Sequence, residues 1–595
     1  MKRRGQFEAT ARHIAESDKR MAASIAGQCA AIRLQGLVML MFCTVPLIGQ
    51  GVPGDTRTRP ASDLTVPATA YVSDAKYANL GEACAAAGSV TLTIGRLWTD
   101  SPSQTLRCAV RFLPAGKIQA AKGAVIAFAG AVVCPTYQQC FDTTTNAGSS
   151  VTFTMAPINL NPLQWGAVAD GTGKGGTDQS AKFQAAATAS RGDLLIPHAP
   201  LCYAVADEIV MHSNTVVYSD TRATCVQKLY GSHEHPVLDA GDGTAPVSNI
   251  WFRNFTVDGN NANIAGVALD RYNQGIAFAG ASDSGTDNMT VENAFTGGIS
   301  VACWGPRPMI NAGDSVWIIN TVVTRSGRNN IEMLCGTNTH IVGGEMSFAG
   351  EGDHVDSMST GVDVEPFATG QFVTGFSMDH VEIDHNLSGG ARLQAIWDPD
   401  AIFTVVDVNV HDNGGQGTGG LYAVNDAIAD VPPFSTKSVL SITGGTFGNN
   451  TAAAGISFAG WNHVYISGED IYGSSRGVLA AARNPDVVLG PGTVSGTLFD
   501  ISADGPGSTV TLAGAKLVCS VHCIQPGEEA SVIIPVTTFF SLMTHELFSP
   551  FGSSAGTAMA GVSGHNGLPA SSSSLFAPGK LCILPTICYL VNVGR

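Results

Sequence analysis

Short runs in which apolar and polar residues alternate recur between about residues 247 and 535, separated by polar Asn, Asp and Gly residues. Examples are NIWFRNFTVDGNN (249–261), FTVVDVNVHDNGG (403–415) and SVLSITGGTFGNN (438–450). Alternation with a period of two predicts β-strands, and the polar residues between the runs predict tight turns. Equivalent strand starts recur at intervals of 23 to 39 residues, and we place them at Ile250, Met289, Val316, Ile341, Val373, Phe403, Val439, Val464, Val487 and Val510.

This repeat predicts a solenoid. A single coil cannot bury its apolar face alone, so stacked coils share one continuous core, with neighbouring strands about 4.8 Å apart. An ordinary β-sandwich is the alternative, but ten units in one pattern argue against it. The longer intervals would be loops on one face, where functional residues usually lie.

The segments that flank the repeat differ from it. Short strands are predicted at 89–95 and 150–155, and the Ala-rich segment TDQSAKFQAAATAS (177–190) predicts a helix with Thr, Asp and Ser at its start. Ser, Gly and Ala dominate much of the chain after residue 540. We therefore expect three regions: a strand-rich region at 67–160, the solenoid at 161–540 and an irregular C-terminal tail at 541–595.

The N-terminal 49 residues predict an export signal. The apolar run LQGLVMLMFCTVPLI (34–48) includes Pro46 and is shorter than the roughly 20 residues that a spanning helix needs. Seven basic and three acidic residues precede it, so residues 1–33 carry a net charge of +4. The rest of the chain carries −20, which gives the total of −16. Residues 50–66, rich in Pro, Thr, Gly and Asp, are predicted to be a linker.

This leader predicts a secreted, periplasmic or cell-surface protein. Thirty-three residues before the apolar run is long for a signal peptide. One alternative is a start at Met21. Another is an uncleaved segment that anchors the protein in the membrane, which would be its only membrane contact.

Twelve cysteines outside the leader fall into near-neighbour pairs, as expected of disulfides in an exported protein. The candidate pairs are Cys84/Cys108, Cys134/Cys140, Cys202/Cys225, Cys303/Cys335, Cys519/Cys523 and Cys582/Cys588. Zinc is disfavoured because no CxxC pair and no histidine cluster accompany them. Buried reduced thiols remain the alternative.

Composition excludes several classes of protein. With 44% hydrophobic residues the chain is not disordered, and with 13% charged residues and 69 glycines it is not a coiled coil. The glycines have no period of three, which excludes collagen. The net charge of −16 argues against nucleic acid as a partner.

One segment resembles the opening of the pectate-lyase-like superfamily domain, which occurs in rhamnogalacturonases, epimerase-like proteins and phage tailspikes. The segment is QWGAVADGTGKGGTDQSAKFQAAATASRGDLLIPHAPLCYAV (164–205). The matching positions are Gly166-Ala167, Asp170-Gly171, Asp178, Phe183-Gln184 and Ile196-Pro197. Gln179 replaces the second acidic residue of the family pattern, and His198-Ala199 stands where glycine is usual.

The resemblance implies an all-β fold, a right-handed parallel β-helix with a single chain per coil and a short N-terminal capping helix. The helix and first strands would cover an edge that could otherwise aggregate. A second motif, Gly361-Val362-Asp363-Val364-Glu365-Pro366, is similar to one found in a bacterial subgroup of this superfamily. Together the resemblance covers about 164–480.

Asp363 and Glu365 are the candidate catalytic pair. In a strand, residues i and i+2 point to the same face, so both carboxylates would face outward while Val362 and Val364 face the core. Carboxyl groups about 5–9 Å apart span the separations used in retaining and inverting glycoside hydrolysis. Nearby like charges move the two pKa values apart, which gives one acid and one base. The alternatives are a structural acidic pair and a set of calcium ligands.

Six further residues are candidate substrate ligands. Arg328 on the preceding coil could bind a sugar carboxylate, although a plain surface arginine is an equal alternative. A polar loop at 350–357 would form a cleft wall or simply a solvated loop. Trp397 could stack on a sugar ring or be buried. The complete set is Arg328, Asp353, His354, Asp356, Arg392 and Trp397.

These features favour an exported polysaccharide-active protein, with glycoside hydrolysis as the first hypothesis. The acidic charge favours a neutral or lightly charged glycan. A polysaccharide lyase or epimerase is one alternative, and a non-catalytic adhesin or spike-like protein is another. No cofactor is expected unless calcium binds. VEIDH (381–385) only partly matches classical pectate lyases, and the polygalacturonase signatures are absent. The sequence leaves the sugar, linkage and oligomeric state open.

Overall fold

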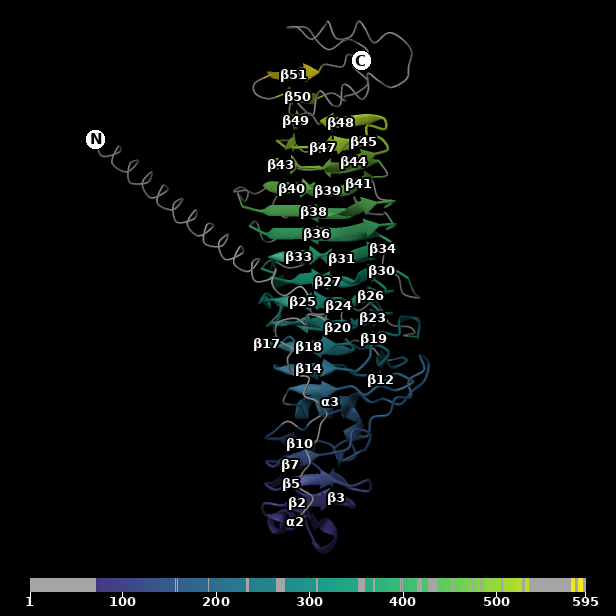
Figure 1. Ribbon diagram of the computed structural model, residues 1–595, viewed down its shortest axis with the longest axis vertical. Helices are drawn as coiled ribbons and strands as arrows, with labels where there is room; N and C mark the ends of the chain where they lie inside the picture. The colour runs from purple at the N-terminus through teal and green to yellow at the C-terminus, as the bar shows by residue number, and fades with distance from the viewer. Residues whose placement is uncertain are drawn as a thin grey trace, which may run out of the picture. The chain divides into compact units, whose positions relative to one another are not determined.

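The computed structural model describes most of the chain from Tyr71 onward (Figure 1). The chain divides into two compact units, residues 1–69 and 70–595, and all described residues lie in the second. The described residues are 71–155, 157, 159–190, 192–231, 235–263, 273–305, 309–351, 359–366, 370–395, 398, 400–414, 420–425, 437–451, 454–473, 475–481, 484, 486–504, 507–526, 530–534, 579–583 and 587–591, the last two ranges in backbone only. The predicted signal segment, the linker and most of the predicted tail therefore lie outside them.

Residues 193–534 form a parallel β-helix in which each coil contributes strands to three parallel columns. Figure 1 shows the strands of successive coils one above another. Column A contains β11 (Asp193–Leu195), β14 (Thr215–Tyr218), β18 (Ile250–Arg253), β22 (Ser284–Asp287), β25 (Val316–Ile319), β29 (His340–Val342), β33 (Phe376–Asp379), the first halves of β36 (Ile402–His411) and β38 (Val439–Gly448), β40 (His463–Ser467), β43 (Asp486–Leu489), β46 (Thr509–Leu512) and β49 (Ser531–Ile534).

The other two columns complete each coil. Column B contains β12 (Tyr203–Val205), β15 (Cys225–Lys228), β19 (Thr256–Asp258), β23 (Thr290–Glu292), β26 (Val322–Thr324), β30 (Glu345–Ser347), β34 (Glu382–Asp384), the second halves of β36 and β38, β41 (Asp470–Gly473), β44 (Gly492–Gly496) and β47 (Ala515–Leu517). Column C contains β13 (Ile209–Met211), β16 (Leu238–Ala240), β20 (Ile276–Ala279), β24 (Ile299–Ala302), β27 (Ile331–Met333), β31 (Thr360–Val364), β35 (Gly389–Gln394), β37 (Leu421–Val424), β39 (Ala454–Ala459), β42 (Arg476–Ala480), β45 (Phe499–Ala503) and β48 (His522–Pro526).

The N-terminal strand-rich region is a second, smaller stack with the same three-column plan. All of its strand pairs are parallel. Its columns are β1 (Tyr71–Ser73), β2 (Thr91–Ile94), β5 (Ala109–Phe112) and β8 (Val132–Val133); β3 (Leu97–Ser101), β6 (Lys117–Ala120) and β9 (Phe141–Asp142); and β4 (Gln104–Leu106), β7 (Val125–Phe128) and β10 (Ser150–Phe153). The sequence predicted these strands but not their stacking.

Two helices lie at the ends of the stacks. The helix predicted at 177–190 is present as α3 (Ser180–Ala189), and it contacts both β10 and β13. In Figure 1 it lies between the smaller stack and the first strands of the larger one. A second helix, α2 (Leu80–Ala87), packs on β1, β2 and β4 at the start of the smaller stack. The remaining elements are η1 (Asp74–Lys76), η2 (Pro162–Trp165), η3 (Asn261–Asn263) and the short pairs β17 (Val247–Ser248) with β21 (Ala281–Ser282) and β28 (Gly336–Thr337) with β32 (Val373–Thr374).

Left-handed backbone conformations bend the chain between columns A and B. Asn254, Asn288 and Asn320 occupy equivalent corners with φ of 60°, 54° and 46°. Asparagine tolerates this conformation better than most residues, which explains the polar turn pattern in the sequence. One corner uses Gly343-Gly344 instead, and a Cβ on Gly344 would lie 2.1 Å from the carbonyl oxygen of Thr321.

Inward-facing side chains from each coil form the core. In column C, Ile331, Val362 and Leu421 belong to one registered row, and all three are fully buried. Burying each such side chain contributes about 1.5–3 kcal/mol relative to leaving it exposed. Repetition over many coils therefore stabilises the whole stack.

A ladder of buried asparagines closes the corner between columns B and C. Asn413 accepts hydrogen bonds from the backbone N–H of Asn386 (3.0 Å) and from its side-chain amide (2.9 Å). The side-chain amide of Asn413 donates to the carbonyl oxygen of Ile383 (3.0 Å) and to Asn450 Oδ1 (2.9 Å). Backbone groups that strand pairing leaves unpaired at this corner are thereby satisfied.

We expect Asn413→Ala to lower the free energy of unfolding by about 2–4 kcal/mol, because buried backbone groups of Asn386 and Ile383 lose their partners. The measurement is urea-induced unfolding followed by circular dichroism. Asn425→Ala is the matched control, since no side-chain hydrogen bond of Asn425 occurs in the described residues. Equal midpoints for the two variants would contradict the ladder's role.

Five of the six predicted disulfides are confirmed. They are Cys84–Cys108, Cys134–Cys140, Cys202–Cys225, Cys303–Cys335 and Cys519–Cys523. The pairs separated by 23, 24 and 32 residues join neighbouring coils. The side chains of Cys582 and Cys588 lie outside the description, although the backbone register places these two residues opposite each other.

Part of the predicted irregular tail continues the sheet. β50 (Gly579–Ile583) pairs in parallel with β49, and β51 (Ile587–Val591) pairs with β50 in antiparallel. The low-complexity composition of the tail concealed these two strands. No helix in the described ranges is long and apolar enough to cross a membrane.

Candidate functional site

Asp363 and Glu365 lie at the end of β31 and share the face opposite to the core. Val362 and Val364, which alternate with them, are fully buried in the apolar core. In the column C register, Asp363 lies between Glu332 of β27 and Arg392 of β35. Three neighbouring coils therefore bring charged side chains to one place.

These side chains form a charged cluster, which we define as Glu332, Asp363, Glu365, Arg328 and Arg392. Arg328 Nη1 donates to Glu332 Oε1 at 2.8 Å, and Arg328 Nη2 donates to Glu365 Oε2 at 3.2 Å. Arg392 Nη2 lies 3.0 Å from the other oxygen, Glu365 Oε1. Both carboxylate oxygens of Glu365 are thus paired with a guanidinium group.

Asp363 has a different environment. Its side chain is 0% exposed, and its Oδ2 accepts a hydrogen bond of 2.8 Å from the amide of Asn329. Its Oδ1 has no hydrogen-bond partner among the described residues. Burial first, and then the charge of Glu365, raises the pKa of Asp363 well above its ordinary value, while Arg392 and Arg328 oppose the shift. The site therefore favours the protonated form of Asp363 over its carboxylate.

A carboxyl group with a raised pKa beside an ion-paired carboxylate is the division of roles that acid–base chemistry requires. The accessibility differs from the sequence-based expectation, however, which placed both carboxyl groups outward in an open groove. Asp363 exposes no surface, and only 13% of the Glu365 side chain is exposed. The physical reason is that the two arginines neutralise the carboxylates within the stack.

The predicted ligands Arg328 and Arg392 therefore contact protein carboxylates. Among the described residues, no group of three or more His, Cys, Asp or Glu side chains is arranged to hold a metal ion. Guanidinium nitrogens already contact the oxygens of Glu365, so the charged cluster does not fit calcium. Asp353, His354, Asp356 and Trp397 lie outside the described residues, and their proposed roles stay predictions.

Asp363 provides a test by pH. Because the pKa of Asp363 is raised in the folded protein, the folded state keeps a proton that the unfolded chain releases above about pH 4. The contribution of Asp363 to the free energy of unfolding therefore falls as the pH rises towards the folded pKa. We expect Asp363→Asn, which needs no proton, to gain stability relative to the natural chain as pH increases, by up to about 1.4 kcal/mol per pH unit. Chemical unfolding between pH 4 and 8 measures the difference. Parallel pH profiles would contradict a buried protonated Asp363.

The structure also reveals an outward row of side chains on column A that sequence reasoning missed. The register places Trp251, Gly285, Trp317 and His340 at the same position of four successive coils. We call Trp251, Trp317 and His340 the aromatic row. The rings of Trp317 and His340 lie 4.1 Å apart, and the Arg253 guanidinium lies 5.1 Å from the ring of Trp251.

All three side chains of the aromatic row are half-buried, so each presents part of its surface to solvent. Gly285 separates the tryptophans, and a Cβ there would lie 2.0 Å from the carbonyl oxygen of Trp317. His340 donates to or accepts from the hydroxyl of Ser377 at 2.7 Å. Burial lowers the pKa of His340, with Asp314 opposing, so the ring is neutral at neutral pH.

The row could have been found by aligning the coils in their true register. Our predicted starts Met289 and Ile341 are not equivalent to Ile250. The residues in register with Ile250 are Ser284, then Val316 and then Thr339. Ser284 and Thr339 are buried polar residues, so no apolar residue marks the position equivalent to Ile250 in these two coils.

The strand pairing defines the class of protein: an all-β parallel β-helix, as the resemblance implied. No protein-family model and no curated protein matches the chain. Solved structures similar to it include the A-module of the mannuronan C-5 epimerase AlgE6 of Azotobacter vinelandii, with 16% identity, a TM-score of 0.40 and coverage of 63% of this chain and 93% of that one.

Two others differ in activity. One is the catalytic unit of a thermostable GH87 α-1,3-glucanase from Streptomyces thermodiastaticus strain HF3-3, with 13% identity, a TM-score of 0.43 and coverage of 64% and 68% of the two chains. The other is PfbA, a surface adhesin of Streptococcus pneumoniae, with 13% identity, a TM-score of 0.35 and coverage of 63% and 88%. Such low values assign no activity to this chain.

Proposed function

We propose that this protein is an extracellular polysaccharide-binding β-helix that contacts its glycan along the aromatic row. The observation that carries the proposal is the registered placement of Trp251, Trp317 and His340 on one outward face. The C–H face of a pyranose ring packs on an aromatic ring, which supplies a large apolar contact and a defined orientation. The disulfides support an oxidising, extracellular compartment.

The spacing of the row supports a chain-like ligand. Trp251 and Trp317 are two coils apart, so their backbone positions are separated by about 9.6 Å, twice the strand spacing. This length is similar to that of two pyranose units in an extended polysaccharide. A glycan parallel to the column axis would then meet one coil with each sugar.

The charge of the chain favours a neutral or lightly charged glycan. Residues 34–595 carry a formal charge of −20, which repels polyanionic polysaccharides. The side chains in the row itself are uncharged at neutral pH, and Arg253 beside it forms an ion pair with Asp287 at 3.9 Å. Stacking and hydroxyl hydrogen bonds would therefore dominate recognition.

Glycoside hydrolysis is the second candidate, and the environment of Asp363 favours it. Asp363, whose pKa is raised, would supply a general acid, and the ion-paired Glu365 beside it would supply a carboxylate. This activity requires the charged cluster to open to substrate, because Asp363 is fully buried. Lyase or epimerase chemistry and a non-catalytic adhesin or spike-like role are the other possibilities.

One screen separates these functions. The purified protein is run in native gels containing dextran, galactomannan or an anionic pectin, and the same mixtures are assayed for products. Retardation by a neutral polysaccharide is the expected result, and no retardation in any gel would contradict the proposal. New reducing ends would indicate hydrolysis, an unsaturated uronate product would indicate a lyase, and retention without turnover would indicate an adhesin.

A further inference from the structure

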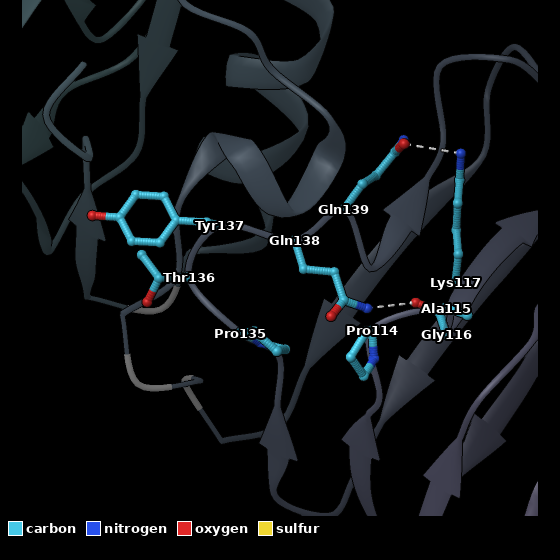
Figure 2. Close-up of a pocket in the computed structure, with 9 residues that line it drawn as sticks. All are labelled: Pro114, Ala115, Gly116, Lys117, Pro135, Thr136, Tyr137, Gln138 and Gln139. Atoms are coloured by element: carbon cyan, nitrogen blue, oxygen red, sulfur yellow. Dashed lines mark hydrogen bonds between the residues drawn. The ribbon is translucent and has the colours of Figure 1, made fainter. Parts of the chain in front are cut away.

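The smaller N-terminal stack carries a surface hollow of about 700 Å³, within the range of about 300–1,000 Å³ typical of small-molecule sites. Two short segments line it, residues 114–117 and 135–139. Figure 2 shows Tyr137 extending to one side of the hollow, with the Gln139–Lys117 contact at the other. This part of the chain lies outside the region that resembles the pectate-lyase-like superfamily.

The loop that forms one wall is held in place without a ligand. The Cys134–Cys140 disulfide closes it, and the Gln138 amide donates to the carbonyl oxygens of Leu113 (2.6 Å) and Gly116 (2.9 Å). The backbone N–H of Cys140 donates to the carbonyl oxygen of Gln164 in η2 (2.9 Å). A preformed wall reduces the entropy lost when a ligand binds.

The groups that remain available are those that suit a sugar. The Tyr137 side chain is 78% exposed, and Pro114 and Pro135, which also line the hollow, are exposed as well. The side-chain oxygen of Gln138 accepts no hydrogen bond in the described part of the chain, and in the view of Figure 2 it lies between the two prolines. The lining of the hollow thus includes an aromatic ring, two proline rings and an acceptor oxygen.

The hollow offers no unpaired charge. Lys117, its one charged lining residue, lies 3.1 Å from Asp142 Oδ2 and donates to Gln139 Oε1 at 3.0 Å. A phosphate or carboxylate ligand would have to disrupt this pair. An uncharged ligand with hydroxyl groups and one apolar face can bind without breaking the Lys117–Asp142 pair, and a neutral pyranose has this chemistry.

The hollow lies where the two stacks meet. The Gln139 amide donates to the carbonyl oxygen of Trp165 at 3.4 Å, and η2, which contains Trp165, contacts α3. Burial raises the pKa of Tyr203 of β12 to about 12, and the nearby Tyr137 adds to this shift. A ligand here would contact the chain beside the first coil of the larger stack.

We propose that this hollow is a second glycan-binding subsite, which takes a neutral pyranose unit stacked on Tyr137. The inference rests on the proposed polysaccharide binding, because it adds a separate contact for the same class of ligand. Tyr137 is the stacking residue, and Gln138 accepts a hydrogen bond from a sugar hydroxyl. With this subsite, the smaller stack would take part in binding the glycan.

The test is hydroxyl-radical footprinting of the full chain with and without dextran or galactomannan, read by mass spectrometry, together with gel retardation. We expect oxidation of Tyr137 to fall at least threefold with the polysaccharide. Tyr137→Ala should weaken retardation at least fivefold, and Tyr137→Phe should retain it. Tyr472, which lies on column B and is 43% exposed, is the control. Its oxidation should not change when the polysaccharide is added, and Tyr472→Ala should be retarded as strongly as the natural chain.

The outcomes separate the two proposals. Retardation with unchanged oxidation of Tyr137, or full binding by Tyr137→Ala, would overturn the subsite alone. Protection of Tyr137 without protection of Trp251 and Trp317 would overturn the role of the aromatic row and keep the subsite. No retardation of the natural chain by either neutral polysaccharide would overturn both.

Discussion

Glu365→Gln is expected to lower the free energy of unfolding by about 3 kcal/mol, whereas Asp363→Asn two positions earlier should not lower it at neutral pH. Glu365 pairs with Arg328 and Arg392, so a neutral amide weakens the charge compensation of both guanidinium groups, while Arg328 keeps its ion pair with Glu332. Burial and the charge of Glu365 raise the pKa of Asp363, so the site disfavours the charged carboxylate that the amide replaces. The two substitutions are matched in chemistry and opposite in consequence.

Urea unfolding of both variants and of the natural chain is the measurement. If Asp363→Asn were the more damaging change, Asp363 would be the ionised partner and the assignment of protons in the charged cluster would be wrong. The same variants report on catalysis. If a glycan product is formed, Asp363→Asn should abolish it while leaving stability intact, and unaltered turnover would remove Asp363 from the mechanism.

The second large effect is expected from Trp251→Ala with Trp317→Ala. Loss of both rings should weaken retardation in neutral-polysaccharide gels at least tenfold, because two aromatic contacts, each commonly worth about 1 kcal/mol or more, are lost together. Neither ring belongs to the apolar core, so the fold should survive, and circular dichroism checks this. Tyr472→Ala is again the matched control.

The single variants make this prediction sharper. Trp251→Ala and Trp317→Ala should each weaken retardation less than the pair, because the glycan keeps the other contact. A further variant, Gly285→Ala, should impair folding instead, since its Cβ would collide with the backbone of Trp317. Unchanged retardation by the double tryptophan variant would place the glycan elsewhere.

The parallel β-helix could be predicted from the sequence because its determinants are local. Alternation of side chains, Asn and Asp at left-handed corners and cysteines one coil apart each follow from short-range physics. Ile250, Val316, Phe403, Val464, Val487 and Val510 were placed in the true register. The placement of four strand starts was wrong, because register depends on which residue of the next coil faces inward. These are Met289, Ile341, Val373 and Val439.

Tertiary partners could not be predicted in the same way. The strands of the smaller stack were expected, but nothing local indicates that α3 would lie between two stacks and contact β10 as well as β13. Arg328 and Arg392 were expected to contact substrate, and their distance in sequence from Glu365 hid the ion pairs that they form with it. Trp251 and Trp317 lie 66 residues apart in the sequence, and only the register places them in one row two coils apart.

The most direct test of the central claim is a crystal structure of the protein with an oligosaccharide taken from a neutral polysaccharide that retards it. We expect pyranose rings stacked over Trp251 and Trp317, with the glycan chain parallel to the axis of column A. An oligosaccharide bound at the opened charged cluster, with the aromatic row unoccupied, would contradict it.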